Sequence, residues 1–207
     1  MPIRGVIFDL DGTLVDSRLD FELMRREMEL EGSPPLLEAL AQLPPARAAH
    51  CWRILLDHEQ RGAAQATLYP GVSAFLEMLH ARGLRRGVVT RNGRETTLAM
   101  LSRLGLAFDP VVCREDAPTK PDPAALWKIC TAWGVAPSDC VMIGDFRFDI
   151  EAARRAGTHA VLFTGGGGPS GLADHADVDL ALASFADAGP FWRWIEQIDL
   201  GGGRASC

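Results

Sequence analysis

The stretch that decides the fold is the N-terminal sequence "IRGVIFDLDGTLVDS" (residues 3–17), in which an apolar run ends in two aspartates separated by one leucine. Bringing carboxylates together in a buried place costs on the order of several kcal/mol per ion unless something neutralises them. Because Asp9 and Asp11 follow directly on the apolar run, we expect a buried strand to deliver both to one spot. The function of the site at the end of this strand has to explain why two carboxylates are buried there.

Four more short apolar runs follow this one, and each ends at a polar or glycine-bearing turn. Near-continuous apolar strands without alternation indicate burial on both faces, as in a parallel sheet. Segments of helical period separate them, at residues 72–82, 93–104, 122–134 and 147–156. Alternating strands and helices predict an α/β fold with a doubly wound parallel sheet. The runs are "RGVVT" (86–90), "PVVC" (110–113), "CVMIGD" (140–145) and "HAVLF" (159–163).

The segment 16–68 breaks this alternation because its pattern is helical only. Proline pairs at 34–35 and 44–45 divide it into two or three helices. Its place directly after the first strand predicts an α-helical cap over the carboxyl edge of the sheet, although a helical excursion that only packs on the sheet remains an alternative. The predicted organisation is an α/β core (1–15 and 69–200), a cap (16–68) and a flexible tail (201–207).

Composition bounds the function further. The 207 residues are 47% hydrophobic and 23% charged, with a formal net charge of -6, which disfavours nucleic acid and anionic membranes as partners. No stretch approaches the ~20 apolar residues of a membrane span, and no signal-peptide pattern is present. Five scattered cysteines fit free thiols, so we expect a soluble, cytoplasmic protein.

The glycine-rich segment 164–171 lacks the lysine of a P-loop and is expected to be a plain loop.

Polar residues follow the predicted strands at their carboxyl ends, which meet at one edge of a parallel sheet. Asp9 and Asp145 end two of the strands, and Asp149 comes four residues after Asp145. Their mutual repulsion requires a cation, and hard oxygen ligands without histidine or cysteine indicate Mg²⁺ rather than zinc.

The same edge carries groups that suit a phosphate dianion, namely the Thr90 hydroxyl, the Lys120 ammonium and the amides of glycine-bearing turns. Lys120 is one of only two lysines among the 21 lysines and arginines of the chain, and a compact point charge suits a phosphate crowded by a metal. Each feature alone also has a structural explanation: a threonine after a strand is often a helix cap, and a lysine before proline often starts a helix.

In this order the residues resemble the motifs of the haloacid dehalogenase superfamily of phosphotransferases. "DLDGTLVDS" resembles its first motif, Thr90 its second, Lys120 in "KPDP" its third and "GDFRFD" its fourth. The resemblance covers nearly the whole chain and is nearest to the phosphoglycolate-phosphatase-like subfamily. It implies a Rossmann-like core with an α-helical cap inserted after strand one.

The resemblance also implies roles. Asp9 would be the nucleophile that forms an aspartyl-phosphate, and Asp11 the general acid and then the general base. Mg²⁺ would be held by Asp9, the main-chain carbonyl of Asp11 and Asp145, with Asp149 as a ligand or a support of the ligands. The residues that would hold the phosphate are Thr90, Arg91, Asn92 and Lys120.

The expected function is therefore a Mg²⁺-dependent phosphatase acting on a small phosphorylated metabolite, such as phosphoglycolate or a sugar phosphate. A sugar phosphomutase of the same superfamily and a non-catalytic regulatory module are the alternatives. Asp11 argues against dehalogenation, and the absence of lysine from segment 16–68 argues against phosphonate cleavage. The short cap leaves the substrate open, with Arg18, Arg25 and Arg26 as candidates for a substrate carboxylate. The bulk of Arg147 and Phe148 leaves a displacement of Asp149 open, and the oligomeric state is not predicted.

Overall fold

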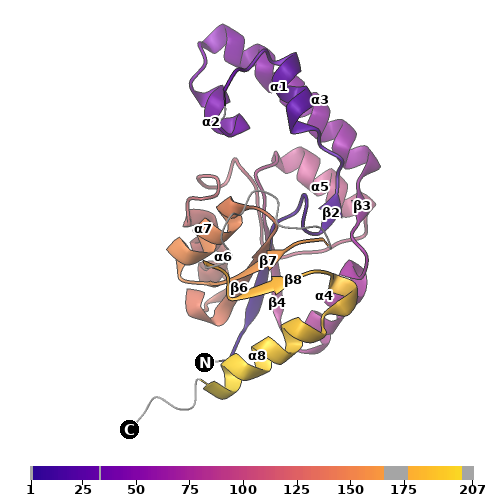
Figure 1. The fold of residues 1–207 in the computed structure, drawn as a ribbon, viewed down its shortest axis with the longest axis vertical. Helices are drawn as coiled ribbons and strands as arrows, with labels where there is room; N and C mark the ends of the chain where they lie inside the picture. Colours follow the sequence, from indigo (N-terminus) through magenta and orange to yellow (C-terminus); the bar gives the residue numbers. More distant parts are fainter. Residues whose placement is uncertain (1, 33, 166–176, 202–207) are drawn as a thin grey trace.

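The computed structural model describes residues 2–32, 34–165 and 177–201. A six-stranded sheet has the order β5-β4-β1-β6-β7-β8, and every neighbouring pair in it is parallel. The strand predicted from the opening sequence therefore lies near the middle of the sheet (Figure 1). The strands are β1 (Gly5–Phe8), β4 (Arg85–Val89), β5 (Val111–Val112), β6 (Cys140–Gly144), β7 (His159–Phe163) and β8 (Leu180–Leu182).

The five strands predicted from apolar runs are confirmed, and β8 at the edge was not predicted. β1 has β4 on one side and β6 on the other, so the chain winds outward from it in both directions. That reversal of strand order is the topological switch point, where open α/β sheets bind ligands at the carboxyl ends of their strands. Asp9 is the first residue after β1, and its amide donates a hydrogen bond to the carbonyl of Ile143 in β6 (2.9 Å).

Helices cover both faces of the sheet, as expected for a doubly wound fold. Val6 and Phe8 of β1 pack on the side of α4, α5 and α8, whereas Ile7 packs on the side of α6 and α7. Trp192 and Trp194 belong to the first of these two cores, so the tryptophans near the C-terminus pack internally. The helices are α4 (Val72–Ala81), α5 (Arg94–Arg103), α6 (Ala124–Trp133), α7 (Arg147–Ala156) and α8 (Gly189–Gly201), with short 3-10 helices η1 (Pro137–Asp139) and η3 (Phe185–Asp187).

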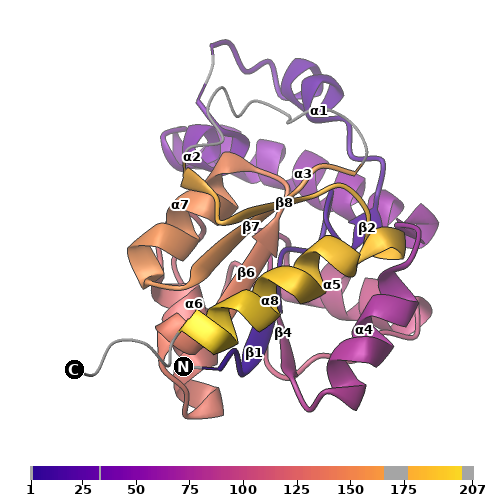
Figure 2. The ribbon, with the colours of Figure 1, turned by 60° about the horizontal axis from the view of Figure 1, so that its bottom comes forward.

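Three helices lie between β1 and α4 and have a small core of their own: α1 (Phe21–Glu27), α2 (Leu36–Ala41) and α3 (Pro45–Gln65). Proline starts α3 and immediately precedes α2, as the proline pairs predicted. The two chain segments that lead into and out of these helices pair as antiparallel strands, β2 (Val15–Asp16) and β3 (Thr67–Leu68). Figures 1 and 2 show the three helices beyond the end of the sheet at which the predicted site residues lie.

Most of the glycine-rich segment 164–171 and residues 202–207 of the predicted tail lie outside the described residues. Among the described residues, no helix is both long and apolar enough to cross a membrane. Four cysteines in the described part of the chain are buried and free, as expected for thiols: Cys51, Cys113, Cys130 and Cys140.

Candidate active site

Three predicted site residues form a buried charged cluster at the end of the central strands. The Lys120 ammonium lies between two carboxylates: it pairs with Asp9 and, at 2.6 Å, with Asp149. It also donates a hydrogen bond to the carbonyl of Val89 at the end of β4 (3.1 Å). The bulky residues at positions 147 and 148 therefore do not displace Asp149, which caps α7 by accepting a hydrogen bond from the amide of Phe146 (3.0 Å).

The carboxylate of Asp145 completes the acidic set. Thr13 donates a hydrogen bond to it (3.1 Å), so the first and fourth motifs are in direct contact. Gly12 has φ +83°, and a Cβ at this position would overlap the Asp145 carboxylate, as a Cβ on Gly144 would overlap Asp149. Only glycine allows the backbone to approach the carboxylates so closely in these two places.

Burial shapes the ionisation of this cluster. It raises the pKa of Asp9 well above its ordinary value, against the opposing pull of Lys120. It also raises the pKa of Asp145 to about 6, reinforced by the negative charge of Asp149. Burial alone lowers the pKa of the Lys120 ammonium, but Asp149 and Asp9 outweigh it and the pKa lies above the ordinary value. Three carboxylates thus share one ammonium and need further positive charge to be ionised together.

The chemistry of the three carboxylates fits a metal ion. One oxygen each of Asp9, Asp145 and Asp149 lie within 4.8 Å of one another, close enough to share a single cation. All three donors are hard oxygens, which hold Mg²⁺ or Ca²⁺ rather than a thiophilic metal. The excess of negative charge in the cluster is what a divalent ion would neutralise.

Asp11 lies apart from this cluster and has different partners. One of its oxygens accepts a hydrogen bond from the side-chain amide of Asn92, and the other is buried with no hydrogen-bond partner among the described residues. Burial raises the pKa of Asp11, and the nearby polar groups of Ser17 and Asn92 offset this only in part. The main-chain amide of Asn92 donates a hydrogen bond to the Thr90 hydroxyl (3.1 Å), which holds Asn92 in place. Asn92 was expected to contact the phosphate, and in the structure its side chain contacts Asp11 instead.

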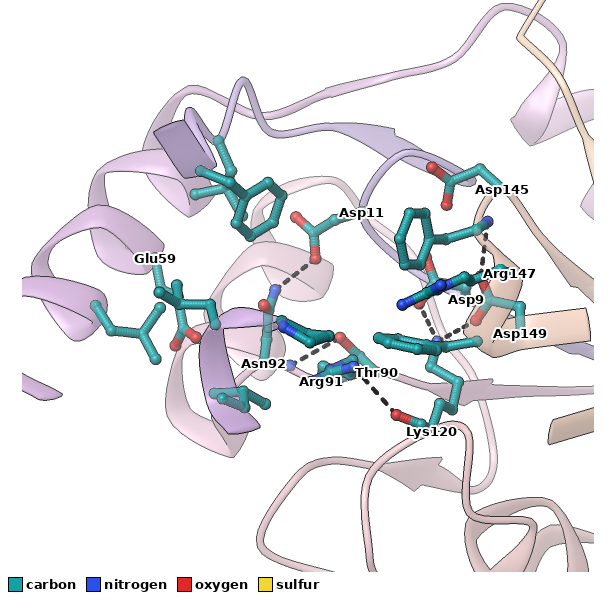
Figure 3. A pocket seen from close by; sticks show the side chains of 18 of the residues that line it. Asp9, Asp11, Glu59, Thr90, Arg91, Asn92, Lys120, Asp145, Arg147 and Asp149 are labelled. Atoms are coloured by element: carbon teal, nitrogen blue, oxygen red, sulfur yellow. Dashed lines mark hydrogen bonds and ion pairs between the residues drawn. The ribbon is translucent and has the colours of Figure 1, made fainter. Parts of the chain in front are cut away.

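Arg91 also has partners that the sequence did not indicate. Its guanidinium makes a two-bonded ion pair with Glu38 of α2 (2.7 and 2.8 Å) and donates to the carbonyl of Lys120 (3.1 Å). The ring of Phe148 lies between the guanidinium groups of Arg91 and Arg147, each 4.9 Å from its centre. Figure 3 shows Arg147 among the acidic residues of the cluster.

Glu59 of α3 is a buried residue of the site that sequence reasoning missed. It pairs with Arg114, in the loop after β5, and accepts a longer hydrogen bond from the amide of Gly93 (3.4 Å). Burial raises the pKa of Glu59, against the opposing effect of Arg114. The signal was present in the sequence: Glu59 falls on the apolar stripe of α3 that includes Cys51 and Leu55, where an unpaired charge is costly.

A cavity of about 670 Å³ joins these residues. Its walls come from the ends of β1, β4 and β6 on one side and from α1, α2, α3 and their connections on the other (Figure 3). All eight predicted site residues line it: Asp9, Asp11, Thr90, Arg91, Asn92, Lys120, Asp145 and Asp149. Of the three arginines considered for a substrate carboxylate, only Arg25 lines the cavity, and its guanidinium donates to the carbonyls of Gly32 (2.6 Å) and Pro34 (2.8 Å).

The position of Lys120 predicts a large contribution to stability. We expect Lys120→Met to lower the free energy of unfolding by about 3 kcal/mol at neutral pH, because it leaves Asp9 and Asp149 buried without their counter-charge. The other lysine provides the control: Lys128 is exposed and bonds one main-chain carbonyl, so Lys128→Met should change stability by less than about 0.5 kcal/mol. Urea unfolding of both variants measures the difference, and equal stabilities would contradict the buried ion-pair assignment.

Fold and site together define a doubly wound α/β protein with a lysine-bridged acidic centre at the carboxyl ends of its strands. The haloacid dehalogenase-like hydrolase family matches residues 3–157. The chain belongs to this family.

Individual relatives agree with this assignment. The chain is 32% identical to a phosphoglycolate phosphatase of Rhodospirillum rubrum, over 97% of this chain and 94% of the relative. It is 31% identical to a haloacid dehalogenase-like hydrolase domain-containing protein of Arabidopsis thaliana, over 86% of this chain and 80% of the relative. A crystal structure of a predicted phosphoglycolate phosphatase from Haemophilus somnus has a TM-score of 0.71 at 23% identity, covering 92% of this chain and 98% of that one, and so shares the fold. The chain is an enzyme of the phosphatase group in this family.

Proposed function

We propose that the chain is a Mg²⁺-dependent phosphatase that hydrolyses a phosphate monoester in two steps through an aspartyl-phosphate on Asp9. The observation that carries the proposal is the Lys120 ammonium held between Asp9 and Asp149 at the floor of a cavity. Lys120 offers the positive charge that a phosphoryl group needs beside the attacking oxygen, and it holds the Asp9 carboxylate in one orientation.

In the first step a carboxylate oxygen of Asp9 attacks the phosphorus, and the bond from phosphorus to the ester oxygen breaks. Asp11 gives its proton to the departing alcohol oxygen. In the second step Asp11, now ionised, takes a proton from a water molecule whose oxygen attacks the same phosphorus. The bond between phosphorus and Asp9 then breaks, which releases inorganic phosphate and restores both carboxyl groups. Splitting the reaction in this way replaces one difficult displacement by two easier ones.

The environments of the two aspartates support this division of roles. Asp9 is paired with a buried ammonium, which favours its ionised, nucleophilic form. Asp11 has no cationic partner within salt-bridge distance in the described part of the chain, so nothing there holds it in the ionised form as Lys120 does Asp9. Because burial raises the pKa of both aspartates, the buried ammonium beside Asp9 alone is the difference that supports assigning Asp9 as the nucleophile and Asp11 as the acid.

Asp9, Asp145 and the main-chain carbonyl of Asp11 would hold Mg²⁺, with Asp149 as a further ligand or as the partner that orients Lys120. Bound there, the ion would offset the negative charge of the carboxylates and of the transferring phosphoryl group.

The segment 16–68 would act as a cap, with β2 and β3 as its two connections to the core. Thr90 would contact the phosphate, and Asn92 would hold Asp11 in place.

The first test is release of product from p-nitrophenyl phosphate and a panel of small phosphate monoesters. We expect turnover with Mg²⁺, loss of more than about 100-fold after removal of metal with EDTA, and recovery on adding Mg²⁺ back. Turnover that EDTA leaves unchanged would contradict the metal assignment. If no ester releases phosphate but phosphoryl groups exchange between two sugar hydroxyls, the chain is a phosphomutase.

A further inference from the structure

The cavity is far larger than the phosphoryl group that its floor would hold. At about 670 Å³ it lies in the middle of the range of pockets that enclose a whole drug-sized molecule. The charged groups gather at the sheet edge, so the composition of the opposite wall decides what kind of alcohol the phosphate is attached to.

The wall formed by the segment 16–68 is mostly apolar. Phe21 at the start of α1 is 55% exposed although it faces this cavity, and Phe146 on the core side is 39% exposed. An aromatic ring left open to solvent inside a cavity is stabilised when an apolar ligand covers it. The other apolar residues of this wall are Leu19, Pro34, Pro35, Leu36, Leu37 and Leu55.

The charged residues of the same wall are either negative or already engaged. Arg25 keeps its positive charge, but both of its terminal nitrogens donate to main-chain carbonyls, and Glu59 pairs with Arg114. Glu22, which is exposed and lines the cavity, would repel an anion. Arg91, which also lines the cavity, is paired with Glu38. A substrate carboxylate at this end of the cavity would therefore lose its hydration and meet the negative charge of Glu22, while Arg25 already donates from both terminal nitrogens to carbonyls.

Arg147 is another cation that lines the cavity, and it belongs to the other end. Its guanidinium lies 4.9 Å from the ring centre of Phe148 and 5.9 Å from that of Phe146. It is at the start of α7, next to Asp145 and Asp149 (Figure 3). Arg147 therefore adds positive charge at the phosphoryl end, while the opposite wall stays apolar.

We infer that the substrate is a phosphate monoester of an alcohol with a bulky apolar or aromatic body, rather than a short anionic ester such as phosphoglycolate. The inference rests on the proposed phosphatase function and specifies its substrate class. The phosphoryl group binds at Lys120, and the apolar body lies against Phe21 and the leucines of α2 and α3.

The test compares esters of primary alcohols, whose leaving groups have similar intrinsic reactivity. These are 2-phenylethyl phosphate, n-hexyl phosphate, glycerol 3-phosphate and phosphoglycolate. We expect the first two to have a kcat/KM at least tenfold above the last two, since each buried methylene or ring adds binding energy that the polar esters lack.

Two truncations on the same segment localise the effect. Phe21→Ala should lower kcat/KM for 2-phenylethyl phosphate about tenfold and leave glycerol 3-phosphate unchanged. Leu56→Ala is the matched control: Leu56 is 39% exposed on α3, does not line the cavity, and should leave all four esters unchanged. An equal loss for every ester in Phe21→Ala, or no loss at all, would overturn the assignment of this wall.

The rival outcome is preference for phosphoglycolate. In that case the inference is wrong, while the phosphatase function stands, and loss of the preference in Arg147→Gln or Arg25→Gln identifies the cation that binds the carboxylate. Failure of the function itself has a different signature: none of the esters is hydrolysed by folded protein. Binding of 2-phenylethyl phosphonate, measured by calorimetry with Mg²⁺, then decides the inference separately. Binding at least tenfold tighter than that of phosphonoacetate would support the apolar wall without turnover, and equal or weaker binding would overturn it.

Discussion

Asp9→Asn is expected to abolish phosphatase activity, with a fall in kcat on the order of 10⁵-fold, as removal of a nucleophile produces in other two-step hydrolases. An asparagine has nearly the same shape and keeps an oxygen for Lys120, but its amide is a poor nucleophile towards phosphorus. The phosphoenzyme should be lost together with turnover. Rapid quenching after mixing with labelled substrate measures both on the same sample.

The same substitution should not weaken the fold. Asp9 is one of three carboxylates that share a single ammonium, and Lys120 keeps Asp149 as a partner when Asp9 becomes neutral. We therefore expect a thermal midpoint equal to or above that of the wild type, which would separate loss of chemistry from loss of structure. Asp57→Asn is the matched control and should retain full activity, because Asp57 is exposed and, among the described residues, pairs only with Arg61 in α3. An Asp9→Asn protein with more than about 1% of wild-type activity would contradict the assignment of the nucleophile.

The sequence predicted most of the sheet because its strands are buried on both faces. Five apolar runs without alternation, each followed by a helical segment, are typical of this architecture. β8 was missed because it is an edge strand in which only Leu182 is buried, so it lacks the signature of a strand buried on both faces. Helix α8 was missed although its apolar residues recur at helical spacing.

For the site, the sequence predicted which residues converge but not which side chains pair with one another. The convergence of Asp9, Lys120 and Asp145 was predictable, because polar residues at the carboxyl ends of parallel strands share one edge. The partners of individual side chains were not. Arg91 meets Glu38, 53 residues away, and Arg114 meets Glu59, 55 residues away.

Both pairs join the core to the inserted helices, and their geometry depends on how that segment packs over the sheet. The sequence contains no regular spacing for such contacts. A charged residue on an apolar helical stripe is the one sign that a distant partner is required.

Asp11→Asn is expected to separate the two chemical steps. p-Nitrophenolate leaves without protonation, so the first step should proceed with this substrate even when residue 11 has no proton to give. Hydrolysis of the aspartyl-phosphate needs a base, and we expect it to slow by about 10³-fold. Mixing enzyme with p-nitrophenyl phosphate should therefore give a burst of one p-nitrophenolate per active site, followed by a very slow steady state.

The structure makes this variant a clean probe of proton transfer. Asn92 donates to Asp11 in the wild type, and the carbonyl oxygen of an asparagine at position 11 can accept the same hydrogen bond. The position of the side chain is therefore retained while its proton chemistry is removed. Asp57→Asn, which should show no burst beyond that of the wild type, again provides the control. Steady-state turnover equal to the wild type would exclude Asp11 as the base, and absence of the burst would show that Asp11 is needed for attack by Asp9 as well.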